Sequence, residues 1–138
     1  MTRYAVDAAV ALRIVSEPLA VASDHRLVGP AILRSHALAA LYRDVRAGRM
    51  AEAEGRRLLE ELAGLKIRLL GDRVSRATAW RIAAQHDWPD TALAEYVAVA
   101  SLQADALLTD DPALAAAAAG IVRVADIDEL RTPDAVRE

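Results

Sequence analysis

The sequence predicts an α/β fold, a three-layer α/β/α sandwich around a central, mostly parallel sheet. Short apolar runs alternate along the chain with longer segments of helical periodicity. No hairpin signal such as Asn-Gly joins two apolar runs. Alternation of this kind is typical of βαβ units, in which each strand returns parallel to its neighbour through a helix. The abundance of alanine, the best helix former, further indicates helices that pack closely through small side chains.

Each expected element follows from a local pattern of apolar residues and breakers. We expect strands over residues 4–6, 66–70, 106–109 and 121–124, and a short strand or an extended lead-in over residues 26–28. We expect helices over residues 8–15, 31–46, 50–63, 76–85, 87–103 and 113–119. Ser75 is predicted to cap the helix from Arg76, and Asp87 and Asp90 to form a capping box on the next one. The pattern predicts a single domain over 1–130 and a flexible tail over 131–138, with the helical pair in 31–63 as an insertion-like feature.

Composition excludes several classes of protein. The chain has 138 residues, no cysteine and a net charge of −3. The missing cysteine excludes a disulfide scaffold, a zinc-finger-type site and thiol catalysis, and it is consistent with a reducing, cytoplasmic location. The mild negative charge argues against strong non-specific binding of nucleic acid, although a local arginine patch could still steer RNA. The longest nearly apolar run, Ala113 to Val122, is too short to span a membrane.

Two acidic signals follow predicted strands. Asp7 comes directly after the first strand, and Asp110-Asp111 follow the strand that ends at Thr109. Ligands of open parallel sheets bind beyond the carboxyl ends of the strands. If these two strands are neighbours, the carboxylates converge, and oxygen-only ligands suit Mg²⁺ or Mn²⁺. The alternative interpretation is that each aspartate only caps the helix that follows it.

Three other polar residues are weaker candidates. Asp90 and Glu95 lie on the helix before the Asp110-Asp111 strand, but their spacing prevents both from pointing at one ion. Asp90 at a helix start is also explained by the helix dipole, and Glu95 by a solvated helix face. His36, in the first turns of the long helix, is by itself most simply a surface or half-buried residue.

Three segments occur in the order of a known family. They are YAVDAAVALRIV at residues 4–15, LVGPAILRSHALAAL at 27–41 and AEYVAVASLQADALLTDDPALA at 94–115. Together they resemble the PIN-domain ribonucleases, specifically the VapC-like toxins of bacterial toxin–antitoxin pairs. The resemblance spans nearly the whole chain, including the helical pair.

The resemblance implies an endoribonuclease that depends on Mg²⁺ or Mn²⁺. Asp7 matches the family's acid after the first strand, and Asp111 matches the acid of its strand-Thr-x-Asp segment, with Thr109 as hydroxyl companion. The family's other two acidic positions are His36 and Leu93 in this chain. Asp90, one helical turn before Leu93, or Glu95, two residues after it, could substitute. The expected catalytic residues are therefore Asp7, Asp111, Asp90 and Glu95, with metal ligands Asp7, Asp111 and Asp90.

The resemblance also implies partners, namely RNA as substrate, a cognate antitoxin protein and a second copy of the chain in a homodimer. A second hypothesis is a catalytically weakened protein of the same fold that acts mainly by binding an antitoxin through apolar helical grooves. A third is a receiver-like signalling domain, which also clusters aspartates at strand ends. A receiver needs a lysine near the end of its last strand, whereas the single lysine here, Lys66, begins a middle one.

Overall fold

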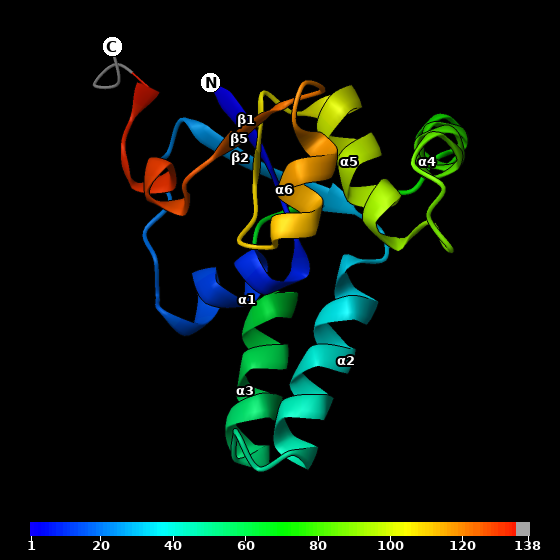
Figure 1. Cartoon of the computed structure of the whole chain (residues 1–138). Helices are drawn as coiled ribbons and strands as arrows, with labels where there is room; N and C mark the ends of the chain where they lie inside the picture. The colour runs from blue at the N-terminus through cyan, green and yellow to red at the C-terminus, as the bar shows by residue number, and fades with distance from the viewer. Residues whose placement is uncertain (135–138) are drawn as a thin grey trace.

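The computed structural model describes residues 1–134 of the chain (Figure 1). Its strands are β1 (Thr2–Val6), β2 (His25–Pro30), β3 (Arg68–Leu70), β4 (Ala106–Leu108) and β5 (Arg123–Ala125). Its helices are α1 (Ala8–Ser16), α2 (Leu33–Arg46), α3 (Glu52–Ala63), α4 (Arg73–Gln85), α5 (Ala92–Gln103), α6 (Pro112–Ala118) and the 3₁₀ helix η1 (Ile127–Arg131). The predicted alternation of strands and helices is confirmed.

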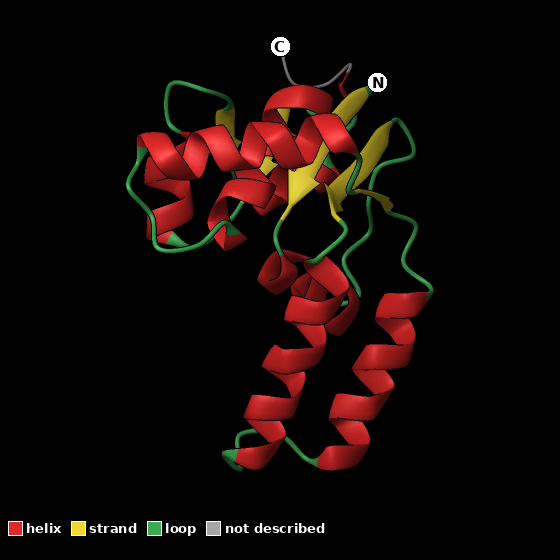
Figure 2. Ribbon diagram, turned by 90° about the vertical axis from the view of Figure 1, so that its right-hand side faces the viewer, coloured by secondary structure: helices red, strands yellow, loops and turns green. Residues whose placement is uncertain are grey.

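The sheet of residues 1–134 has five strands in the order β3-β2-β1-β4-β5, and every pair is parallel. Helices flank it, consistent with the predicted three-layer α/β/α sandwich (Figure 2). The strand order reverses at β1, because β2 and β3 lie on one side of it and β4 and β5 on the other. Such a reversal opens a crevice at the carboxyl ends of the two strands where it occurs. Here those strands are β1 and β4.

The core forms where the central strands meet α5. Tyr4, Ala5 and Val6 of β1 and all three residues of β4 are buried. Helix α5 contacts β1 and β2 on one side and α4 on the other, so it is apolar nearly all round. Ala94, Ala98 and Ala100 of α5 are fully buried, and their small side chains let the helix approach its neighbours closely. Alanine is thus the packing material of these helices, as the composition predicts.

Helices α2 and α3 form an antiparallel pair that projects beyond the carboxyl ends of the strands (Figures 1 and 2). No strand interrupts residues 31–63, as the sequence predicts. Gly55 of α3 lies where the two helices approach closely, since a Cβ atom there would come within 2.8 Å of Val45 Cγ2. In residues 1–134 no helix is long and apolar enough to cross a membrane.

Two predicted helix starts are wrong. Asp72, and not Ser75, is the N-cap of α4, because its Oδ1 accepts a hydrogen bond from the Ser75 backbone N–H at 2.8 Å. The predicted capping box of Asp87 and Asp90 does not form either. Asp87 has a φ of 54°, and its backbone N–H and that of Trp88 bond back into α4, so this segment ends α4 with a Schellman motif. Helix α5 begins only at Ala92.

The last segment that the structure describes contacts the amino end of β2. Arg131 ends η1, the Thr132 carbonyl oxygen lies 2.7 Å from His25 Nε2, and the Asp134 N–H donates to Asp24 Oδ2. The part of the expected flexible tail in residues 135–138 lies outside the described residues.

Candidate functional site

Asp7 and Asp111 lie together at the carboxyl edge of β1 and β4. Val6 pairs with Leu108 in the sheet register, so the residues that follow each strand are neighbours. The Thr109 hydroxyl donates a hydrogen bond to Asp7 Oδ2 at 2.5 Å and accepts one from the Asp111 backbone N–H at 3.0 Å. Thr109 therefore joins the two aspartates that the sequence predicts as the core of the site.

Both aspartates also cap helices. Asp7 Oδ1 accepts from the Val10 N–H at 2.8 Å at the start of α1, and Asp111 Oδ1 accepts from the Ala113 N–H at 2.9 Å at the start of α6. Capping is thus confirmed for both residues, but not that capping is their only role. An ionised carboxylate has about four lone-pair sites, and capping occupies only one of them.

The electrostatic environment of Asp7 is unfavourable to its charge. Asp7 is only 7% exposed, and this burial raises the pKa of its carboxyl group. Hydrogen bonds from Thr109 and Val10 lower the pKa, while the nearby charges of Asp110 and Asp111 raise it further. Within residues 1–134 no cationic side chain forms an ion pair with Asp7 or Asp111, because the adjacent Arg13 binds Asp110 at 2.8 Å instead. A bound cation would offset this repulsion.

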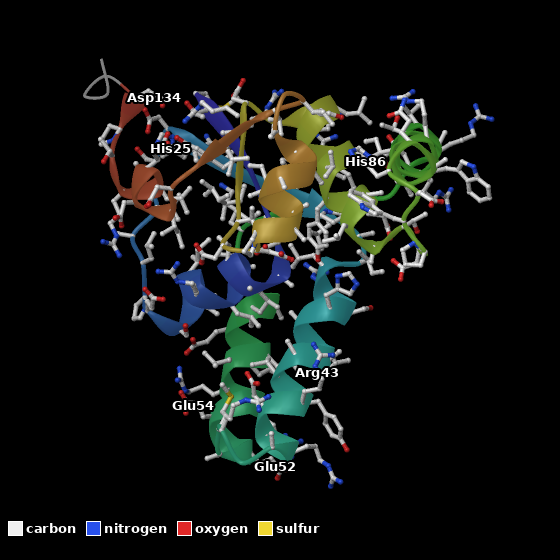
Figure 3. The ribbon with its side chains drawn as sticks, in the orientation of Figure 1. His25, Arg43, Glu52, Glu54, His86 and Asp134 are labelled. Atoms are coloured by element: carbon white, nitrogen blue, oxygen red, sulfur yellow. The ribbon has the colours of Figure 1, made fainter. Side chains whose placement is uncertain are left out.

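Asp7 and Asp111 line an open cavity of about 790 Å³ between the carboxyl edge of the sheet and the projecting helices α2 and α3. Its walls come from α1, α2, α3 and α5 and from the segment after β4. Polar and charged side chains lining it are Asp7, Arg13, Ser16, His36, Arg43, Asp44, Glu54, Tyr96, Asp110 and Asp111. Figure 3 shows Arg43 on α2 and Glu54 on α3. His36 and Leu93, the positions at which the family has acids, also line this cavity.

His36 is held against Tyr96. Its Nδ1 lies 2.8 Å from the Tyr96 hydroxyl, and the two rings stack with centroids 5.6 Å apart. Burial, followed by the charges of Asp7 and Glu95, raises the pKa of Tyr96, so its hydroxyl stays protonated. The pair places a neutral phenol and an imidazole beside the acidic edge.

Asp90 and Glu95 do not line this cavity. Because α5 begins at Ala92 and not at Asp87, Asp90 lies in the exposed turn before it, where its Oδ1 accepts from the Ala92 N–H at 2.9 Å. Glu95 borders a separate small cavity with Arg76 and Val99. The structure thus brings together two of the four predicted site residues in this cavity and leaves Asp90 and Glu95 outside its walls.

Two residues of the site escape sequence reasoning. Arg13 reaches Asp110 across 97 residues of chain, and Tyr96 reaches His36 across 60. No local pattern marks either contact. The spacing of Arg13 and Glu17, four residues apart and joined at 2.8 Å, suggests only an ordinary helix-surface pair.

The donor set suits a hard cation. Mg²⁺ is usually held by one or two carboxylates and keeps several waters. Asp7 and Asp111 can supply these two carboxylates, and the open cavity leaves room for water and substrate oxygens. In residues 1–134 no third ligating side chain joins them to bring three ligand atoms within 4.8 Å of one another. The site is therefore a two-carboxylate site without a complete protein cage.

Comparison with known proteins shows a shared fold and identifies no family. No family model matches the sequence, and no curated protein matches it. The crystal structure of PAE2754 from Pyrobaculum aerophilum is similar to this chain, with a TM-score of 0.69 and 21% sequence identity. The similarity covers 94% of this chain and 94% of that one. At this level of identity it shows that the two chains share a fold.

Proposed function

We propose that the protein is a metal-dependent endoribonuclease, the toxin of a toxin–antitoxin pair, which cleaves RNA phosphodiesters at its acidic edge. The observation that carries this proposal is the hydrogen-bonded unit of Asp7, Thr109 and Asp111 at the point where the strand order reverses. The resemblance of three sequence segments to VapC-like PIN-domain ribonucleases supports it, since the matched acids are Asp7 and Asp111.

Asp7 and Asp111 would hold Mg²⁺ or Mn²⁺. The ion, when bound, would supply an activated water and stabilise the charge that develops on the phosphate. Asp7 contributes a carboxylate that is held rigidly, because Thr109 and the Val10 N–H fix its two oxygens. Preorganisation of this kind keeps a ligand in place without reorganisation during the reaction.

Cationic and aromatic groups around the acids suit an RNA substrate. Arg43 and Arg13 line the same cavity as the aspartates, although Arg13 is paired with Asp110 and Glu17, and they are the cationic groups there that would contact the RNA backbone. His36 presents an imidazole stacked on Tyr96, and aromatic surfaces of this kind accept unpaired bases. The proposed substrate is therefore single-stranded or looped RNA.

The test is RNA cleavage by the purified chain with Mg²⁺ or Mn²⁺. Asp7→Asn and Asp111→Asn should each lower cleavage by about 100-fold or more, since even the loss of a residue that only supports a metal ligand costs about 10–100-fold. Asparagine remains a good helix cap, so both helices keep their starts. Asp72→Asn is the matched control, because Asp72 caps α4 in the same way outside the cavity.

Two outcomes would contradict the proposal. Cleavage that survives both substitutions, or that persists in excess chelator, would show that the activity does not use this site. Thermal unfolding gives a readout independent of turnover. Mg²⁺ should raise the unfolding midpoint of the unmodified chain and of Asp72→Asn, and should leave that of Asp7→Asn unchanged.

A second function is a binding protein of the same fold with weakened catalysis. The observation that favours it is a groove of about 360 Å³ between α2 and α3, which is lined by apolar side chains and also by Arg46, Glu52 and Arg56. Leu38, Tyr42 and Leu59 line it and remain 52%, 64% and 37% exposed. Large exposed apolar side chains that cluster in this way commonly mark a protein interface.

Both functions share the same proposed setting. The chain would act in the cytoplasm, as a homodimer, with its antitoxin bound in the groove of α2 and α3. An amphipathic helix is the partner segment that such a groove accommodates.

A further inference from the structure

A second cluster of ligating side chains lies at the opposite edge of the sheet from Asp7. His25 begins β2 and pairs with Thr2 of β1, so it marks the amino ends of the parallel strands. Asp24 precedes it in sequence, and Asp134 reaches it from the segment after η1. Figure 3 shows His25 and Asp134 close together, far from the projecting helices. One ligand atom from each of the three residues lies within 4.8 Å of the others.

The tautomer of His25 follows from its backbone contact. His25 is 4% exposed, and its Nε2 lies 2.7 Å from the Thr132 carbonyl oxygen. A carbonyl oxygen only accepts hydrogen bonds, so Nε2 must carry a proton and donate it. In a neutral imidazole the other nitrogen, Nδ1, then has a lone pair and no hydrogen.

This lone pair faces two carboxylates. His25 Nδ1 lies 3.7 Å from Asp24 Oδ1 and 3.6 Å from Asp134 Oδ1. His25 Nδ1 and Asp24 Oδ1 are buried, and neither has a hydrogen-bond partner among residues 1–134. Asp134 Oδ1, which accepts a hydrogen bond from the Thr2 hydroxyl, is the third electron-rich atom of the cluster. The two buried atoms without a partner, His25 Nδ1 and Asp24 Oδ1, are costly in this state, so the arrangement favours a positive charge between the three atoms.

The surrounding contacts hold the three ligands in place. The Asp134 N–H donates to Asp24 Oδ2 at 2.9 Å, and the Thr2 hydroxyl donates to Asp134 Oδ1 at 2.5 Å. Asp134 Oδ2 lies 3.4 Å from the Met1 amino nitrogen. The Tyr4 ring meets the His25 ring edge-on, with centroids 5.1 Å apart. Asp24 Oδ1 and His25 Nδ1 thus remain directed at the shared point.

We propose that Asp24, His25 and Asp134 bind a divalent transition-metal ion of the zinc class. One imidazole nitrogen and two carboxylate oxygens are ligands that Zn²⁺ accepts, at about 2.0–2.2 Å. His25 Nδ1 lies 3.6–3.7 Å from the two carboxylate oxygens, so a small inward movement of the side chains would bring all three ligand atoms into contact with one ion. The Nε2–H bond to the Thr132 carbonyl is the outer contact that metal-bound histidines usually make.

The ion would fasten the C-terminal segment to the sheet. Asp134 lies more than 100 residues from His25 in sequence, so the metal would cross-link distant parts of the chain. The site is independent of the proposed nuclease function, because it lies at the other edge of the sheet and shares no residue with the cavity of Asp7.

The test is calorimetric titration of the full chain with Zn²⁺ alone, in a variant carrying Asp7→Asn and Asp111→Asn so that the other edge cannot contribute. We expect one ion per chain and a rise in the unfolding midpoint with Zn²⁺. Adding Asp24→Asn should weaken binding by more than about tenfold, since it replaces a ligand by a neutral group of the same shape. Adding Asp126→Asn, a helix cap outside the cluster, should leave binding unchanged.

Nitrogen-15 NMR of the His25 ring supplies a second readout that does not depend on a variant. Zn²⁺ should shift the Nδ1 signal while Nε2 keeps its proton. Two results would overturn the proposal. One is an absence of Zn²⁺ binding with His25 protonated on both nitrogens at neutral pH, in which case the imidazolium itself balances the carboxylates. The other is Zn²⁺ binding that Asp24→Asn does not weaken.

Discussion

Asp7 combines a structural and a proposed chemical role that make opposite demands on its charge. As a buried carboxylate it is costly to ionise, and as a metal ligand it must be ionised. The bonds from Thr109 and Val10 offset part of this cost, but burial remains the larger effect and the pKa of the carboxyl group stays raised. An uncharged residue at position 7 should therefore lower metal-dependent activity without a matching loss of stability.

The first prediction concerns pH. Because the pKa of Asp7 in the folded chain lies above its ordinary value of 3.8, the unfolded chain loses this proton first as pH rises. The free energy of unfolding that Asp7 contributes should therefore fall between pH 3.8 and the raised value, and stay constant above it. Urea unfolding of the unmodified chain and of Asp7→Asn, in chelator over this range, measures the difference. Parallel profiles would contradict the raised pKa.

The second prediction concerns Leu93, which lines the cavity at a position where the resembled family has an aspartate. A carboxylate there would add a charged ligand beside Asp7 and Asp111. Leu93→Asp should therefore tighten Mg²⁺ binding several-fold, since cation affinity increases with ligand charge. Leu93→Asn is the isosteric control without the charge. Equal Mg²⁺ affinity in the two variants, measured by titration, would show that position 93 does not face the ion.

The third prediction concerns Asp90 and Glu95. Both residues lie outside the cavity walls, so Asp90→Asn and Glu95→Gln should each leave RNA cleavage within about twofold of the unmodified chain, the change expected when no ligand is lost. Single-turnover cleavage at saturating Mg²⁺ measures this. A loss comparable to that of Asp111→Asn would show that the turn before α5 closes onto the site when RNA binds.

At the scale of the element, the helical pair depends on one glycine. The Cβ atom of any residue at 55 would meet Val45 Cγ2 at 2.8 Å, and valine is stiff about χ1 and cannot yield easily. The two helices can approach this closely because position 55 has no side chain. The pair in turn supplies the cavity with Arg43 from α2 and Glu54 from α3.

The fourth prediction follows from this contact. Gly55→Leu should destabilise the chain by about 1–3 kcal/mol, the usual cost of overpacking, although leucine is the better helix former. Ala53→Leu is the matched control, because Ala53 is exposed on the same helix. Urea unfolding compares the two variants. A Gly55→Leu chain as stable as the control would show that α2 and α3 can separate without cost.

At the scale of the whole molecule, the proposed interface and the proposed catalytic edge use largely different side chains. Leu41 lines both the groove and the cavity of Asp7, whereas the exposed groove residues Leu38, Tyr42 and Leu59 do not line that cavity. Binding of a partner should therefore be separable from cleavage.

The fifth prediction tests this separation. Tyr42→Glu should retain RNA cleavage and lose inhibition by the proposed antitoxin, because a new charge among the apolar side chains of the groove opposes an apolar helix face. Trp80→Glu is the matched control, since Trp80 is an aromatic residue of α4, 74% exposed and outside the groove. Cleavage assays with and without the inhibitor measure both effects. Inhibition that Tyr42→Glu retains would place the interface elsewhere.

Sedimentation of the unmodified chain tests the proposed homodimer, and a monomer would contradict it.

Local patterns alone determine most of the elements of this chain. Short apolar runs place β1 and β4, and helical periodicity places α2 and α3, because the burial of one face of a helix leaves its period in the sequence. The same reasoning places Asp7 and Asp111 at strand ends, where parallel sheets bind ligands. It fails at the starts of α4 and α5. Ser75 and Asp87 are residue types that often cap helices, but the backbone at these points is determined by how the preceding segment ends.

The tertiary structure decides which distant residues meet. The pairing of β1 with β4 brings Thr109 against Asp7, and the return of the C-terminal segment brings Asp134 against His25. Each contact crosses about a hundred residues of chain, and its energy depends on the burial achieved by the whole sheet. The sequence by itself therefore determined the elements and the two acids that end them. Only the folded chain decided that Asp90 and Glu95 do not line the cavity of those acids, and that a second cluster forms at the opposite edge.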